Sequence, residues 1–165
     1  MRFGTRVRWT VALLAVLAPL VSSNGNPGPF EDECSRIAHA QIYSNALYVK
    51  EAGDVVGYEL ALQQPHGNPI HARLYIYQGT PNEDGISLSG QISGKKLTIG
   101  GSWVQHLIEY PSKKEIIETQ FIRMDGVLNS SQFQGIIKVE GLAKPIKVHL
   151  KRVDSIWLCK RQAIP

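Results

Sequence analysis

The sequence predicts an all-β fold: a single small antiparallel meander of about eight strands that closes into a β-barrel. Two observations carry this prediction. Apolar and polar residues alternate in short runs along most of the chain, a pattern typical of strands that bury one face. Short groups of Gly, Pro, Asn, Asp and Ser separate the runs, and short connections favour antiparallel neighbours. A two-layer β-sandwich is the alternative that this pattern allows.

The run from residue 70 to residue 77 shows the alternation most clearly. Aliphatic residues occupy its even positions, and polar or aromatic residues occupy its odd positions. The segment 115–124 is also predicted as a strand, because β-branched and aromatic residues dominate it, and Asp125-Gly126 predicts a turn after it. Further apolar rows predict strands within 56–62, 86–92, 97–103, 133–139 and 146–150, and less regular strands fit 42–49 and 104–110.

The first 23 residues show the features of an export signal in the expected order. Arg2, Arg6 and Arg8 give a positive start, Thr10 to Leu20 is nearly unbroken apolar sequence, and small residues then offer a cleavage site. A membrane-spanning helix needs roughly 20 apolar residues, so this shorter run predicts no permanent membrane anchor. We therefore expect a signal peptide at 1–23 and a secreted or periplasmic protein.

The remainder of the chain has the size of one ordinary domain. Residues 24–33 are predicted to be a flexible N-terminal lead, since they contain prolines and glycines that disfavour a regular element. Residues 34–161 then form the single β-barrel domain. No internal repeat and no second domain are predicted.

Two cysteines, Cys34 and Cys159, lie near the two ends of this predicted domain. In an oxidising compartment an isolated pair is most simply a disulfide. The wide spacing differs from the C-x-x-C arrangement of redox pairs. We therefore expect a structural bond that ties the first ordered segment to the last.

The net charge of the chain is +4 at pH 7, and the three arginines of the predicted signal account for most of it. The basic balance therefore predicts no nucleic-acid partner. In the rest of the chain, lysine and arginine concentrate in residues 138–161, where Glu140 and Asp154 are the only acids. Such a basic end can meet an anionic surface, or it can pair with the more acidic part of the same domain.

No catalytic or metal-binding motif stands out. The segment Gly85–Gly90 misses the G-x-S-x-G pattern of serine hydrolases at its last position. The histidines do not pair at metal-ligand spacings: they are His39, His66, His71, His106 and His149. We therefore expect no enzyme, no metal site and no cofactor. An enzyme with a dispersed site would need at least two of these residues to converge in one concavity: His71, His106, Glu109, Glu118 and His149.

Two features of the sequence indicate candidate ligand-binding residues. The row His71, Arg73, Tyr75 and Tyr77 would line a cavity if it faced the barrel interior. The alternative is that this row faces solvent, while the aliphatic residues at the even positions from Ile70 to Ile76 fill the interior.

The second feature is Gly101-Ser102-Trp103, which resembles the G-x-W motif of lipocalins and would imply a calycin-like barrel. In that family the motif lies on the first strand, whereas only 62 residues follow Trp103 here. The motif therefore assigns no family, and Trp103 is expected in the core or at the rim of the barrel.

Together these observations predict an exported, non-catalytic β-barrel that binds a small apolar ligand in its interior. The alternative is a structural or protein-interaction domain that meets an extracellular partner through its outer surface. The filling of the barrel interior separates the two hypotheses.

Overall fold

The computed structural model describes residues 29–63, 69–81, 85–109 and 114–162, and side chains are described for most of these. The predicted signal peptide, at 1–23, and the first part of the predicted lead lie outside the described residues. Among the described residues, no helix is both long enough and apolar enough to cross a membrane.

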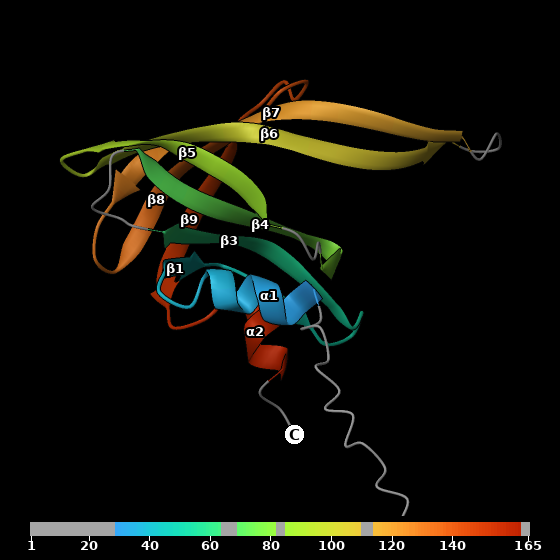
Figure 1. The fold of residues 1–165 in the computed structure, drawn as a ribbon, viewed down its shortest axis with the longest axis horizontal. Coiled ribbons are helices and arrows are strands. Elements are labelled where there is room, and N and C mark those ends of the chain that lie inside the picture. Colours follow the sequence, from blue (N-terminus) through green and yellow to red (C-terminus); the bar gives the residue numbers. More distant parts are fainter. Residues whose placement is uncertain (1–28, 64–68, 82–84, 110–113, 163–165) are drawn as a thin grey trace, which may run out of the picture.

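The chain folds into an antiparallel barrel, as the alternation predicts (Figure 1). Consecutive strands pair with each other from β2 through to β9, the last strand of the chain. β1 pairs with both β9 and β3, which closes eight strands into the barrel and leaves β2 as an extra strand beside β3. The strands are β1 (Gln41–Ser44), β2 (Leu47–Val49), β3 (Asp54–Gln63), β4 (Ile70–Pro81), β5 (Ile86–Ser93), β6 (Lys96–Glu109), β7 (Lys114–Leu128), β8 (Gln132–Val139) and β9 (Ile146–Val153).

The predicted turn at Asp125-Gly126 is wrong, because both residues lie inside β7. Gly126 pairs with Gly135 of β8 across the ladder. A Cβ atom on Gly126 would lie 2.6 Å from Cζ of Phe133, whose side chain is fully buried. The glycine is therefore required for the close approach of an aromatic ring, and its presence does not mark a turn.

Side chains fill the middle of the barrel. Leu60, Leu74, Ile99, Ile122 and Phe133, from five different strands, are fully buried or nearly so in one continuous cluster. These residues occupy the apolar rows of the sequence, so the alternation correctly identified the inward faces. Except at one end of the barrel, the interior is therefore a packed core.

The hairpin of β6 and β7 extends beyond the barrel wall as an arm (Figure 1). β5 pairs with β6 only as far as Gly100, and β8 pairs with β7 only from Ile122 onward. Beyond these points the two strands pair only with each other. One end of the barrel therefore has an incomplete wall.

Two short helices, α1 (Pro29–Arg36) and α2 (Trp157–Gln162), pack against the outside of the barrel (Figure 1). The prediction that residues 24–33 lack a regular element is therefore wrong from Pro29 onward. Proline is well tolerated at the first position of a helix, where its missing N–H would have no partner. Under the helices lies a second apolar cluster, which includes Ile37, Ile42, Val55, Ala61, Tyr75, Tyr77, Ile156 and Leu158.

The predicted disulfide is present. Cys34 in α1 is bonded to Cys159 in α2, with 5.8 Å between their Cα atoms and 125 residues between them in sequence. The bond joins the two helices and thereby the two ends of the domain. A disulfide of this kind fits an extracellular location.

Replacing both Cys34 and Cys159 by serine should lower the free energy of unfolding by about 2–5 kcal/mol, because the unfolded chain would lose a long covalent loop. Urea unfolding of the oxidised protein and of the double variant measures the difference. Dithiothreitol should lower the free energy of unfolding of the wild type and leave that of the variant unchanged. Equal unfolding midpoints for the variant and the oxidised wild type would contradict a stabilising role.

Candidate functional site

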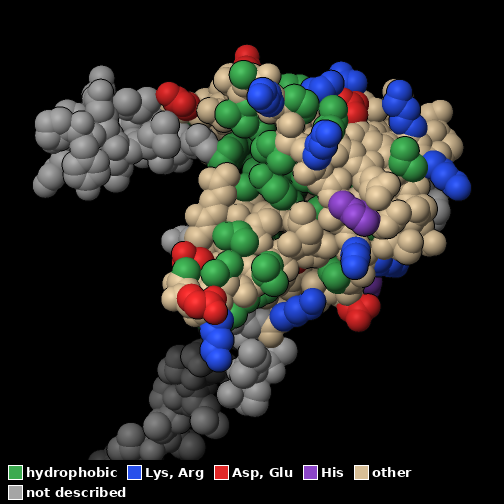
Figure 2. All heavy atoms as spheres, turned by 180° about the vertical axis from the view of Figure 1, so that it is seen from behind, with side chains coloured by type: hydrophobic (Ala, Val, Ile, Leu, Met, Phe, Trp, Pro, Cys, Tyr) green, Lys and Arg blue, Asp and Glu red, His purple; other side chains and the backbone are tan. Residues whose placement is uncertain are grey.

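A hollow of about 350 Å³ opens at the end of the barrel where the wall is incomplete. Inward-facing residues of β3, β4, β6, β7, β8 and β9 line it, together with the loop between β8 and β9. In Figure 2 hydrophobic side chains gather around this hollow near the upper centre of the view. We call it the mouth pocket; its lining is Tyr58, Ile76, Gln78, Trp103, Gln120, Ile137, Val139, Glu140, Gly141, Leu142 and Ile146.

The mouth pocket continues the apolar rows that fill the core. Tyr58, Trp103, Val139 and Ile146 are only partly buried and pack on top of the core cluster. One step further from the core, the inward positions become polar, with Gln78 on β4 and Gln120 on β7. The pocket thus has an apolar floor and a polar rim, as is common for small-molecule sites.

Among the described side chains that line the pocket, the charged one is Glu140, which lies at the rim. Its backbone N–H donates to the carbonyl oxygen of Phe121 at 2.8 Å. The backbone N–H of Phe121 donates in turn to Oε2 of Glu140 at 3.1 Å. These two bonds, made where β8 ends, hold the carboxylate at the edge of the pocket.

The structure separates the five predicted ligand-binding residues. Trp103 lies in the mouth pocket, as expected for a rim aromatic. His71, Arg73, Tyr75 and Tyr77 lie on the opposite face of β4 from the barrel interior, because Leu74 and its neighbours fill the interior. This row therefore does not line an interior cavity. It does not simply face solvent either, since both tyrosines are buried under the helices.

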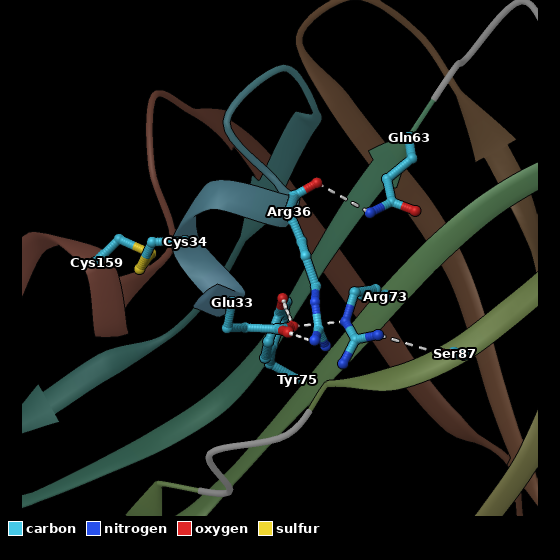
Figure 3. A network of polar contacts seen from close by, with 8 residues as sticks. All are labelled: Glu33, Cys34, Arg36, Gln63, Arg73, Tyr75, Ser87 and Cys159. Atoms are coloured by element: carbon cyan, nitrogen blue, oxygen red, sulfur yellow. Dashed lines mark hydrogen bonds and ion pairs between the residues drawn. A yellow bond between two sulfur atoms is a disulfide. The ribbon is translucent and has the colours of Figure 1, made fainter. Parts of the chain in front are cut away.

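Glu33 explains why Tyr75 is buried and Arg73 partly buried under α1 (Figure 3). Its Oε1 accepts hydrogen bonds from Nε of Arg73 and from the hydroxyl of Tyr75, both at 2.5 Å. The neighbouring residue in α1, Cys34, points the other way and bonds to Cys159. The helix is thus fixed to β4 by a buried ion pair on one side and to α2 by a covalent bond on the other.

Glu59 has a corresponding role under α2. It is 1% exposed and lies on the outer face of β3. Its carboxylate accepts three hydrogen bonds: from the hydroxyl of Tyr77 at 2.6 Å, from Oγ of Ser44 at 2.8 Å and from the backbone N–H of Trp157 at 2.9 Å. A buried carboxylate needs such donors. Glu59 therefore joins α2, β1 and β4, and its role is structural.

Burial raises the pKa of the hydroxyl groups of Tyr75 and Tyr77 above the ordinary tyrosine value, and the carboxylates of Glu33 and Glu59 raise it further. The unfolded chain therefore loses these protons more readily than the folded protein. The contribution of each tyrosine to stability is complete below about pH 10 and is lost as the pH rises beyond that value.

Replacing Tyr77 by phenylalanine should destabilise the protein by about 1–3 kcal/mol at pH 8, because it leaves Glu59 with one donor fewer. Above pH 10 the free energy of unfolding should fall less steeply in this variant, by up to about 1.4 kcal/mol per pH unit. Urea unfolding between pH 8 and pH 11.5 measures both effects. Tyr48→Phe is the matched control, since that side chain is 51% exposed. An equal change of slope in the control would contradict the assignment.

The residues that a dispersed catalytic site would need are only partly described. His71 lies on β4, and His149 lies on β9 beside Gln132, so these two histidines are on strands that are not neighbours. The side chains of His106 and Glu109 lie outside the described residues. Within the described part of the chain, no group of three or more His, Cys, Asp or Glu residues gathers as metal ligands would.

Only part of the mouth pocket could be recognised from the sequence. Trp103 was found through its motif, and Tyr58 and Ile76 belong to the inward rows. Gln78 and Gln120 extend inward rows with a polar residue, and this break in the pattern could have marked the end of the barrel. Glu140 carries no such signal, because its position depends on the long-range pairing with Phe121.

In comparisons with known proteins, no family model, no curated protein and no solved structure matches this chain. A functional assignment therefore rests on the geometry and chemistry of the sites themselves.

Proposed function

We propose that the protein is a non-catalytic binding module that holds a small apolar molecule in the mouth pocket. The observation that carries the proposal is a hollow of about 350 Å³ with an aliphatic and aromatic floor. Ligand sites begin at about 300 Å³. A dry cavity of about 150 Å³ can hold benzene, so the mouth pocket suits a ligand of roughly twice that size.

The place of the ligand follows from the packing. Fully buried side chains fill the barrel below the mouth, so the proposed ligand lies at the open end and not in the middle of the barrel. The incomplete wall beside β5 gives it a path from solvent. Leu47 and Val56, which are 63% and 40% exposed, extend the inward apolar row of β2 and β3 beyond Tyr58.

The proposed setting is outside the cytoplasm, as a secreted or periplasmic protein. The predicted export signal at 1–23 supports this, and so does the disulfide between Cys34 and Cys159.

Replacing Val139 by tryptophan should fill the mouth pocket and weaken binding of an apolar probe by about tenfold or more. The uncharged dye N-phenyl-1-naphthylamine, which fluoresces more strongly in apolar surroundings, reports binding. Val127→Trp is the matched control, because Val127 lies on the outer face of β7 and is 51% exposed. Thermal unfolding verifies that both variants fold. Absence of saturable dye binding to the wild type would contradict the proposal, and so would equal loss in the two variants.

Contact with a protein partner through the outer surface is the second candidate function. It is supported by the arm of β6 and β7, whose outer face exposes Val104, Ile117 and Phe121 by 51–63%. Exposed apolar side chains grouped in this way mark interaction surfaces in many proteins. If the mouth pocket binds no probe, this face of the arm becomes the better candidate.

A further inference from the structure

The rim of the mouth pocket carries a carboxylate, Glu140, that forms no ion pair with any side chain the structure describes. Oε2 of Glu140 accepts the backbone N–H of Phe121. The described lining also contains no cationic side chain. The pocket therefore offers negative charge and acceptor oxygens to a ligand.

The exposed charges described around the mouth are mixed, with a small excess of acidic residues. Glu118 on the arm and Glu51 and Asp54 at the tip of the β2–β3 hairpin are exposed at this end of the barrel, against Lys50 and Lys144. The lysines of β8 and β9, Lys138, Lys147 and Lys151, alternate with core residues and point outward from the barrel wall. Figure 2 shows acidic side chains mainly to the left of the hollow and basic side chains mainly to its right. This field favours approach of a cation to the mouth.

The aromatic side chains of the pocket add a second attraction for positive charge. Tyr58 and Trp103 both line the hollow. Aromatic rings, tryptophan above all, attract ammonium groups through their π electrons. The side-chain carbonyl oxygens of Gln78 and Gln120 can accept N–H bonds from the same group. A carboxylate ligand would find no cationic partner among the described lining residues.

We infer that the ligand of the mouth pocket is a cationic amphiphile, with an apolar body on the floor and an ammonium group at the rim beside Glu140. This inference rests on the proposed binding function, and it adds the chemical class of the ligand. The apolar body packs against Ile76, Ile137 and Ile146. The ammonium group donates hydrogen bonds to the carboxylate oxygens of Glu140.

Three compounds with the same eight-carbon tail test the inference at pH 7: octylammonium, 1-octanol and octanoate. Each competes with N-phenyl-1-naphthylamine for the wild-type protein. Octylammonium should bind about fivefold to tenfold more tightly than 1-octanol, as expected for one partly exposed ion pair with a cation–π contact. Octanoate should bind most weakly. The advantage of octylammonium should shrink between 20 mM and 500 mM salt, because salt screens exposed charges.

Glu140→Gln should remove most of this advantage and leave the affinity for 1-octanol within about twofold, since the substitution keeps the size of the side chain. Glu51→Gln is the matched control, because it removes the same charge from a residue that does not line the pocket. Equal or tighter binding of 1-octanol to the wild type would overturn the inference and leave the proposed function intact. An equal effect of the two substitutions would also overturn it. Failure of the dye and all three compounds to bind would instead overturn the proposed function.

Discussion

Closure of the barrel depends on β1, which has only four residues. It pairs with β3 on one side and with β9 on the other, so without it the sheet would have two open edges. So short a strand contributes few ladder hydrogen bonds, and its position must be fixed by other contacts. Tyr43 supplies one of them, since its side chain is fully buried and its hydroxyl donates to the carbonyl oxygen of Asn129.

The helices and the buried glutamates supply the remaining contacts. α1 leads directly into β1, and Glu33 fixes that helix to β4 through Arg73 and Tyr75. Glu59 bonds to Ser44 of β1 itself and to the start of α2. Two carboxylates that would be costly to bury alone are stabilised by donors from several elements, and the cost of separating those donors keeps the barrel closed.

The sequence predicted the barrel because its fold follows from local alternation. Rows such as Ile70 to Ile76 reveal which face of a strand is buried without knowledge of its partner. The same rule could not place Tyr75 and Tyr77, because an outward face can be covered by a helix from the other end of the chain. The turn predicted at Asp125-Gly126 was wrong for a similar reason, since glycine is needed there because of Phe133 on the next strand. The rim of the mouth pocket could not be predicted, because it lies where β6 loses its pairing with β5 beyond Gly100 and β7 has not yet begun to pair with β8 at Ile122. Where such pairing stops depends on the whole sheet and not on the local sequence.

The disulfide gives the domain the connectivity of a ring. Residues 34 to 159 form one covalent loop that contains every strand of the barrel. A single proteolytic cut in any turn of this loop, for example at Gly94 between β5 and β6, would open the ring but release no fragment. Two cuts are needed to detach a piece of the sheet, and the antiparallel neighbours would still hold that piece in place. Wherever proteases are present, the bond between the chain ends thus protects turns that lie far from it.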